Sequence, residues 1–112
     1  MVYAKTTNQS IATGDGIFFA NQLGARIKDL SFVQFHPTGL YESNQSSTYL
    51  ITEALRGAGA ILRNEQGVDF MPQYDARASL APRDIVSRAI MSEIKKSTIQ
   101  HVFLDATVLS RS

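Results

Sequence analysis

The stretch Leu80-Ala81-Pro82-Arg83-Asp84-Ile85-Val86-Ser87-Arg88-Ala89 carries the clearest structural pattern in this chain of 112 residues. Proline suits the first turn of a helix, because the N–H groups there have no intrahelical acceptor. From Pro82 onward the apolar residues recur at helical spacing, which predicts a helix whose buried face consists of Ile85, Val86, Ala89, Ile90 and Ile94. A helix with one apolar face needs a second layer to pack on.

Segments on both sides of this helix predict short strands. Residues 60–63 and 68–71, separated by the turn-like Asn64-Glu65-Gln66-Gly67, are typical of a β-hairpin, and residues 101–104 predict a final strand. Residues 30–35 form a short apolar, β-branched and aromatic run, which predicts a strand that delivers His36 to its end. Pro37 then favours an extended backbone at His36.

Two more helices are expected nearer the N-terminus. The first begins at Gly16, is capped by Asp15 and ends at Gly24, because glycine readily adopts the left-handed conformation at a helix C-terminus. The second covers residues 50–55 and stops at Gly57. Helices and short strands are mixed without a regular βαβ repeat, so the predicted fold class is α+β.

Composition excludes several classes of protein. A chain of this length is one ordinary domain, and its net charge of +1, with acids and bases interspersed, argues against a nucleic-acid partner. No apolar run reaches the roughly 18 residues of a membrane helix and no leader is visible, so we expect a soluble protein with no membrane partner, cytoplasmic by default. The absence of cysteine excludes disulfides, thiolate catalysis and cysteine-bound zinc, and no metal site is predicted.

Several polar residues are candidates for a binding site, and each has a plain structural alternative. His36 could be a packed histidine at a strand end. Thr52 and Glu53 could be polar residues of a first helical turn, where the macrodipole favours a carboxylate by about 0.3–1 kcal/mol. Asp15 could be only a helix cap, although the glycines on both sides of it leave the backbone open to a bound group.

Arg83 is harder to explain by local structure alone. A cation in the first turn of a helix is disfavoured by the macrodipole, by about 0.3–1 kcal/mol. Asp84 beside it could offset this effect, so a surface ion pair and a functional arginine are both open interpretations. Arg56 is either a solvated helix residue or the partner of Glu53, three positions earlier on the same helix face.

Five blocks of the sequence carry a resemblance when they are taken together. They are Ala12-Thr13-Gly14-Asp15-Gly16, Phe35-His36-Pro37-Thr38-Gly39, Thr52-Glu53-Ala54-Leu55-Arg56-Gly57, Phe70-Met71-Pro72-Gln73-Tyr74-Asp75 and Leu80-Ala81-Pro82-Arg83-Asp84-Ile85-Val86. The set resembles the flavoprotein subunits of succinate dehydrogenase and fumarate reductase and, more closely, the L-aspartate oxidase family. The resemblance extends over about residues 3–107.

This resemblance implies a fragment of a flavoprotein in which a capping domain closes over an FAD domain. Residues 1–30 would be a piece of the FAD-binding domain, where Asp15 matches a flavin contact, and residues 31–112 the capping domain that covers the substrate. The chain has no G-x-G-x-x-G fingerprint, so FAD is expected in the complete parent protein and not in the isolated fragment. The remainder of the FAD domain is an expected partner, and without it the fragment is expected to self-associate.

The resemblance also implies a reaction. The parent enzyme would oxidise L-aspartate to iminoaspartate, passing a hydride to FAD and then electrons to oxygen or fumarate, as the first step of quinolinate and NAD biosynthesis. Two alternatives stay open: a fragment of a succinate dehydrogenase or fumarate reductase flavoprotein subunit, and a non-catalytic cap-like binding module. Both candidate substrates are four-carbon dicarboxylates, so the site residues do not distinguish them.

Individual roles follow from the same resemblance. His36, Thr52 and Glu53 match substrate-binding positions, and Arg56 supports them. Arg83 matches the catalytic arginine that the family assigns as proton donor or acceptor. Because arginine stays protonated near neutral pH, we favour the weaker role, in which Arg83 fixes a carboxylate and stabilises developing charge.

Overall fold

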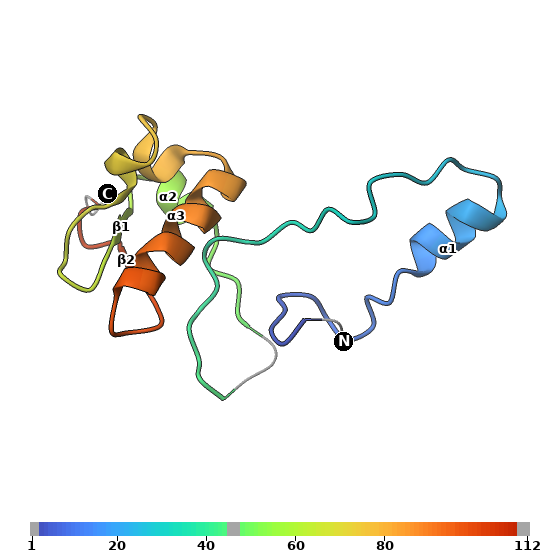
Figure 1. Cartoon of the computed structure of the whole chain (residues 1–112), viewed down its shortest axis with the longest axis horizontal. Helices are drawn as coiled ribbons and strands as arrows, with labels where there is room; N and C mark the ends of the chain where they lie inside the picture. The colour runs from blue at the N-terminus through green and yellow to red at the C-terminus, as the bar shows by residue number, and fades with distance from the viewer. Residues whose placement is uncertain (1–2, 45–47, 110–112) are drawn as a thin grey trace.

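The computed structural model of the chain describes residues 3–44 and 48–109. A compact region, residues 54–109, is joined by a connecting segment, residues 31–53, to an arm, residues 3–30 (Figure 1). The arm carries its helix away from the compact region, so the molecule is elongated, with principal extents of 50 × 31 × 31 Å. The candidate site lies where the connecting segment meets the compact region.

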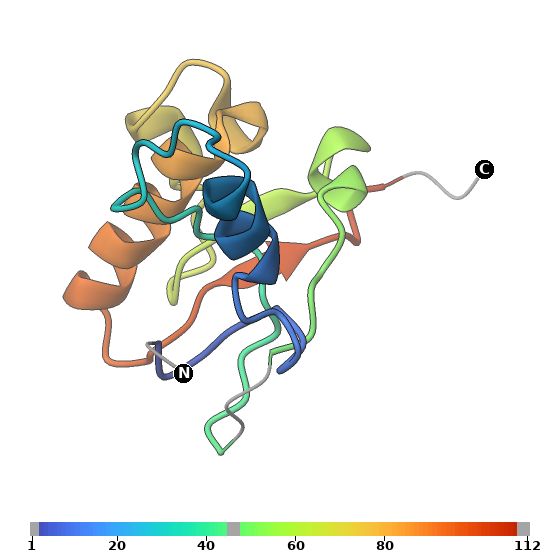
Figure 2. The same cartoon turned by 90° about the vertical axis from the view of Figure 1, so that its right-hand side faces the viewer.

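Helix α3, Arg83–Lys96, is the longest element of the compact region. Pro82 is its N-cap residue and its buried residues recur at helical spacing, which confirms the predicted helix. The short 3₁₀ helices η1, Met71–Gln73, and η2, Ala78–Leu80, lie in the loop that precedes it (Figure 2). The buried core is Leu62, Phe70, Met71, Ala81, Val86, Ala89 and Ile90, with Ile85 and Ile94 half-buried at its margin.

A two-stranded antiparallel sheet completes the compact region. Strand β1, Ile61–Arg63, pairs with β2, Phe103–Asp105, so that Leu62 lies opposite Leu104. Both leucines pack on the core, which brings together two strands that are distant in the sequence. The final strand therefore exists, but it begins at Phe103 and not at residue 101. Helices together with antiparallel strands agree with the predicted α+β class.

The predicted hairpin is only partly formed. Its turn is present, because Asn64 Oδ1 accepts hydrogen bonds from the backbone N–H groups of Gln66 and Val68. Its second arm is reduced to a single bridge between Arg63 and Asp69, since the chain then enters η1 instead of continuing as a strand.

Two other predicted elements need correction. Residues 30–35 form no strand, because no part of the chain that the structure describes pairs with them. Helix α2 covers only Ala54–Gly57, because Leu50, predicted to begin it, is engaged instead in a β-bridge with Gly39. A backbone already paired in a bridge cannot also enter a helix.

The predicted N-cap of the helix in the arm is wrong. Helix α1, Asp15–Gln22, has Gly14 as its N-cap residue, in the left-handed conformation with φ 86°. Asp15 is therefore the first helical residue and not the cap; its Oδ1 accepts a hydrogen bond from Thr13 Oγ1 at 2.9 Å. Glycine takes this backbone conformation without the steric cost that a side chain adds.

The apolar side chains of α1 lie in solvent. The helix has no buried residue, and Phe18 and Phe19 form an edge-to-face pair with ring centroids 5.7 Å apart. No helix in residues 3–44 and 48–109 is long and apolar enough to span a bilayer. The exposed face of α1 is instead the kind of apolar surface that another part of a protein covers.

Candidate active site

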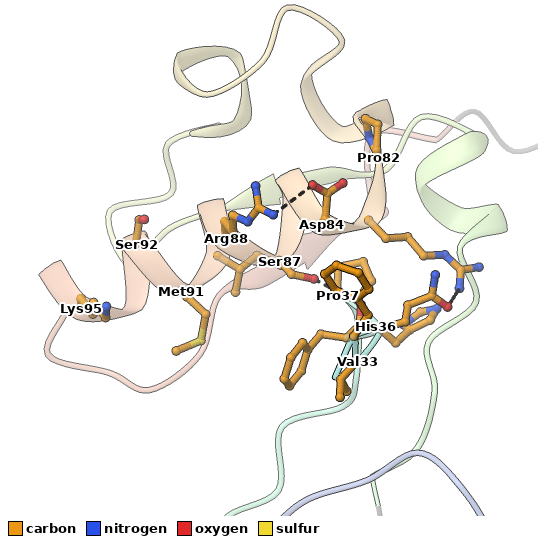
Figure 3. A pocket seen from close by; sticks show the side chains of 15 residues that line it. Val33, His36, Pro37, Pro82, Asp84, Ser87, Arg88, Met91, Ser92 and Lys95 are labelled. Carbon is orange, nitrogen blue, oxygen red and sulfur yellow. Dashed lines mark hydrogen bonds and ion pairs between the residues drawn. The ribbon is translucent and has the colours of Figure 1, made fainter. Parts of the chain in front are cut away.

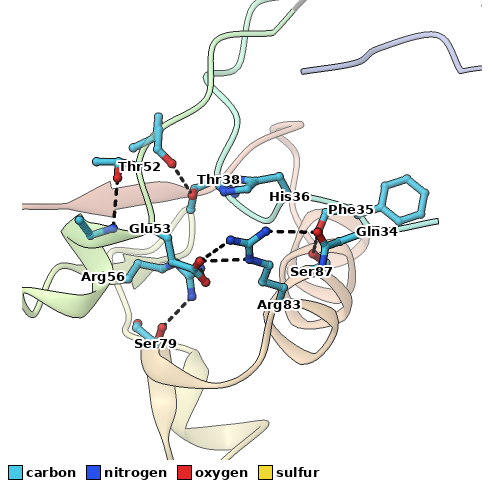
Figure 4. A network of polar contacts seen from close by, with 12 residues as sticks. Gln34, Phe35, His36, Thr38, Thr52, Glu53, Arg56, Ser79, Arg83 and Ser87 are labelled. Atoms are coloured by element: carbon cyan, nitrogen blue, oxygen red, sulfur yellow. Dashed lines mark hydrogen bonds and ion pairs between the residues drawn. The ribbon is translucent and has the colours of Figure 1, made fainter. Parts of the chain in front are cut away.

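Five of the six predicted site residues gather where the connecting segment meets the compact region (Figure 4). They come from separate elements: one from the extended chain before Thr38, two from the entry to α2, one from α2 itself and one from the first position of α3. A site that binds a small polar ligand needs groups that converge from separate elements in this way. The five are His36, Thr52, Glu53, Arg56 and Arg83.

The carboxylate of Glu53 bridges two arginines. Its Oε2 accepts N–H bonds from Arg83 Nε at 3.0 Å and from Arg83 Nη2 at 2.6 Å, and its Oε1 accepts one from Arg56 Nη2 at 2.9 Å. The ion-pair partners of both arginines follow from these contacts. Arg83 pairs with Glu53 and not with Asp84, which pairs with Arg88 at 3.4 Å. Arg56 is the i+3 partner of Glu53 and not a solvated residue.

Arg56 anchors this network in the protein interior. Its side chain is 2% exposed, and its Nη1 donates to the carbonyl oxygen of Ser79 at 2.9 Å. That carbonyl is presented by η2, where Ala78 adopts a positive φ of 49°, a conformation that costs a non-glycine residue about 1–2 kcal/mol. A buried guanidinium needs a paired carboxylate, so Arg56 sets the orientation in which Glu53 faces Arg83.

The ion pairs stabilise the charged form of both partners. Hydrogen bonds from Arg83 lower the pKa of Glu53 below its ordinary value. The same contact raises the pKa of Arg83 above its already high ordinary value. Arg83 is therefore held as a cation at neutral pH, and the geometry favours an electrostatic role over the release of a proton.

His36 is held as a neutral hydrogen-bond donor. Its Nδ1 accepts a hydrogen bond from the backbone N–H of Thr38 at 3.3 Å. Burial, and then the positive charge of Arg83, lower the pKa of His36 below 6.5, so the ring is neutral at neutral pH. The single ring proton then lies on Nε2. The alternative of a packed histidine explains the contact of Nδ1 with Thr38. It does not involve Nε2, which remains a hydrogen-bond donor.

Thr52 supplies a hydroxyl at the entry to α2. Its Oγ1 accepts a weak hydrogen bond from the backbone N–H of Ala54, the first residue of α2, at 3.3 Å. Among the described residues its hydroxyl hydrogen has no acceptor. The first-turn interpretation is wrong for Thr52, because Glu53 is the N-cap residue of α2 and Thr52 precedes it; its hydroxyl keeps one donor for a ligand.

A groove of about 1270 Å³ runs from this cluster along α3 (Figure 3). Residues 32–37 form one wall, and Pro82 with one side of α3 forms the other. His36 and Arg83 lie at the N-terminal end of α3, and Arg88 and Lys95 add cationic groups farther along the same helix. Asp84 lies on the same lining and pairs with Arg88, and apolar side chains such as Phe32 and Met91 make up most of the rest.

Three residues depart from the sequence-based picture. Gln34 was missed: its Oε1 accepts a hydrogen bond from Arg83 Nη1 at 3.2 Å, and the signal was its place two residues before His36, on the same side of an extended chain. Ser79 was missed because it contributes a backbone carbonyl, which no sequence pattern marks. Asp15 was predicted but lies on α1, far from the cluster (Figure 1).

The backbone on both sides of Asp15 is uncovered. A Cβ added at Gly14 or at Gly16 meets nothing within 4 Å, so the backbone at the start of α1 is open to a bound group. Helix N-termini with free N–H groups suit anionic parts of a cofactor. The described residues supply no glycine-rich phosphate loop between a strand and a helix, so they do not form a dinucleotide site by themselves.

Comparison with known proteins shows the family of this chain. The family described as an FAD binding domain matches residues 1–111. The chain belongs to this FAD-binding family. The match indicates FAD in a complete parent protein, as the resemblance of the five sequence blocks implied.

The relatives of this family member are consistent with one another. L-aspartate oxidase of Acinetobacter baylyi is 55% identical over 105 residues, which cover 94% of this chain and 19% of that protein. L-aspartate oxidase of Neisseria meningitidis is 52% identical over 105 residues, covering 93% of this chain and 21% of that protein. Among solved structures, a mutated form of the E. coli quinol fumarate reductase FrdA superposes with a TM-score of 0.75 and 36% identity, covering 96% of this chain and 21% of that chain.

The chain thus spans about a fifth of the length of the proteins it matches. The match to the FAD-binding family runs through the arm, the connecting segment and the compact region alike. The flavoprotein fold is confirmed, whereas the narrower assignment of a capping domain is not confirmed by these comparisons.

Proposed function

We propose that this chain is a segment of an L-aspartate oxidase and that it forms the wall of the active site that grips the substrate's carboxylate. The observation that carries the proposal is the network in which buried Arg56 orients Glu53 and Glu53 orients Arg83. The identity of about half with L-aspartate oxidases over almost the whole chain supports the same conclusion.

Arg83 has donors to spare for a substrate. A guanidinium carries five N–H groups. Glu53 takes two of them and Gln34 takes one, which leaves one on Nη1 and one on Nη2. Two such N–H groups bind a carboxylate in a forked, charge-assisted geometry. His36 Nε2 and the Thr52 hydroxyl add donors from the other side of the site.

In the proposed reaction L-aspartate loses a hydride from Cα and a proton from its nitrogen, which yields iminoaspartate. FAD, when bound, accepts that hydride, and its electrons pass on to oxygen or fumarate. Arg83 holds the substrate carboxylate and stabilises charge that develops beside it, while Glu53 keeps the guanidinium oriented. The raised pKa of Arg83 supports this role over the family's proton-transfer role.

We also propose the division of the chain that the sequence suggests. Residues 1–30 would belong to the FAD domain, with Asp15 at the flavin, and residues 31–112 to the capping domain, although residues 1–2, 45–47 and 110–112 lie outside the described parts. The exposed apolar face of α1 supports this division, because it needs a cover that the compact region does not provide. The remainder of the FAD domain is the proposed cover, and self-association is expected without it. The cytoplasmic location stays a prediction.

The principal alternative is a flavoprotein subunit that oxidises succinate or reduces fumarate. The superposition on quinol fumarate reductase favours it as the second candidate, because a site for one four-carbon dicarboxylate holds another. A non-catalytic binding module is the third. Assays of the complete flavoprotein with L-aspartate and with succinate separate the three: the proposal expects turnover of L-aspartate, the second candidate turnover of succinate, and the third no turnover.

Replacing the central arginine tests the proposed role. In the complete flavoprotein, Arg83→Ala is expected to lower L-aspartate turnover by about 10³-fold or more, because the charge-stabilising group is lost. FAD content and thermal stability should stay unchanged, since Arg83 is partly exposed and makes no core contact. Turnover and bound flavin are measured side by side.

Arg77→Ala is the matched control. Arg77 is also a partly exposed arginine in an ion pair, with Asp75, but it lies outside the network. Its replacement should leave turnover unchanged. Full activity of Arg83→Ala, or equal losses in the two variants, contradicts the proposed role.

A further inference from the structure

We propose that Gln34 is a substrate-binding and positioning residue of this site, whose side-chain oxygen fixes Arg83 and whose side-chain N–H groups bind a carboxylate of the substrate. The inference rests on the proposed function in one respect, because it takes the ligand to be a dicarboxylate. It adds a residue that lies outside all five sequence blocks, directly before the block that begins at Phe35.

The contact with Arg83 fixes which way the amide of Gln34 faces. A guanidinium nitrogen only donates, so the atom of Gln34 that lies 3.2 Å from Arg83 Nη1 has to be the oxygen. The amide nitrogen and its two hydrogens then point away from that contact. Among the described residues those two hydrogens have no acceptor.

The backbone places Gln34 at this position without help from the core. Side chains alternate along an extended chain, so Gln34 and His36 are expected on the same side of the connecting segment; Gln34 contacts Arg83, and His36 lies near enough to be affected by its charge (Figure 4). Between them, the carbonyl of Phe35 accepts a hydrogen bond from Ser87 Oγ of α3 at 3.4 Å. The segment is therefore tied to the helix that carries Arg83, four residues from that arginine.

The site has more free hydrogen-bond donors than acceptors, which favours an anionic ligand. Both oxygens of Glu53 are already taken by guanidinium groups. What remains is donors only: two N–H groups of Arg83, two of Gln34 and the Nε2–H of His36. A carboxylate supplies the acceptors that all three side chains lack, and its binding satisfies Gln34 and Arg83 together.

The test uses the complete flavoprotein and malonate, a dicarboxylate that has no bond for the flavin to oxidise in this way. Malonate binding is followed by the change in flavin absorbance. Gln34→Met keeps the length of the side chain and removes the amide, so the dissociation constant is expected to rise about 10–100-fold, as for lost hydrogen bonds to a charged group. Gln34→Asn, which keeps the amide but draws it back, should weaken binding in the same direction.

Gln34→Glu provides a readout that a purely structural role does not move. A carboxylate at this position pairs with Arg83 and repels malonate, so binding near neutral pH should be weaker than in Gln34→Met and should recover as the pH falls and the new carboxyl is protonated. Gln66→Met, in an exposed turn remote from the site, is the matched control and should bind malonate as the parent does.

Each outcome decides the inference. A dissociation constant in Gln34→Met within about twofold of the parent value overturns it. So does a Gln34→Glu variant that binds malonate as well as Gln34→Met at neutral pH. Absence of malonate binding in the parent flavoprotein contradicts the dicarboxylate site itself, and this role with it, whereas failure of the Gln34 variants alone leaves the proposed function standing.

Discussion

The arm and the compact region both contain large aromatic side chains, but only one of them buries these side chains. Phe70 is 0% exposed in the core beneath α3, whereas Phe19 on α1 is 62% exposed. Burial of apolar area is the main source of folding free energy, at about 25 cal/mol per Å². The compact region therefore supports its own fold, and the arm depends on a cover from elsewhere.

The candidate site lies where the connecting segment meets the compact region, and its residues differ in how firmly they are held. Arg56 and Arg83 lie on the compact region, where Ser79 holds Arg56, and both arginines pair with Glu53 at the end of the connecting segment. His36 and Gln34 come from the connecting segment, which is tied to α3 by weaker contacts. The arginines are therefore preorganised by strong ion pairs to Glu53, whereas the donors of His36 and Gln34 depend on the weaker contacts that hold residues 34–36 beside α3.

The largest effect expected from this comparison is on stability. In the 112-residue chain, Phe70→Ala should lower the free energy of unfolding by about 3–5 kcal/mol, because it leaves a cavity in the core. Phe19→Ala removes the same atoms from a solvent-exposed position and should change that free energy by less than about 0.5 kcal/mol. Urea unfolding, followed by circular dichroism, measures both.

Equal losses of stability in the two variants would break the comparison, because they would place the arm within the same cooperative unit. A loss in Phe70→Ala alone would sharpen it. The slope of the unfolding transition should also be unchanged in Phe19→Ala, since that slope follows the area exposed on unfolding.

A smaller effect is expected at Glu93, a carboxylate of α3 that is almost fully buried. Tyr74 Oη donates to its Oε1 at 2.7 Å and Asn64 Nδ2 to its Oε2 at 3.2 Å. The hydrogen bond from Tyr74 is the main reason that the pKa of Glu93 lies below its ordinary value of 4.5. This stabilisation is present at pH above the ordinary value and is lost as the pH falls through the lowered pKa.

Glu93→Gln should therefore cost about 1–3 kcal/mol of unfolding free energy near neutral pH and progressively less as the pH is lowered below the ordinary pKa. The measurement is urea unfolding over a range of pH. Asp29→Asn, in the arm, is the matched control: its side chain is more than half exposed, and it should show little loss at any pH. A loss in Glu93→Gln that does not depend on pH would contradict the role of the ionised carboxylate.

The sequence predicted the parts of this molecule that local patterns determine. Pro82 and the helical spacing of Val86 and Ala89 located α3, and the i+3 spacing of Glu53 and Arg56 raised the ion pair as an alternative. These signals depend on residues close together in the chain. The fragment character and the flavoprotein family followed from combined motifs.

The remaining features depend on contacts that no local pattern contains. The pairing of β1 with β2 joins distant segments through Leu62 and Leu104, and the run at residues 30–35 looked like a strand but has no partner within the described chain. Gln34 was overlooked because its role exists only once Arg83 has been brought beside it from 49 positions away. Tertiary contacts override strand propensity in such cases.

Amide hydrogen exchange of the 112-residue chain tests the central claim most directly, namely that the cationic wall rests on a self-supporting region while the arm does not. The account predicts slow exchange in α3 and in β1 and β2, with α1 exchanging as fast as an unstructured peptide. Protection of α1 equal to that of α3 in the monomeric chain would contradict it.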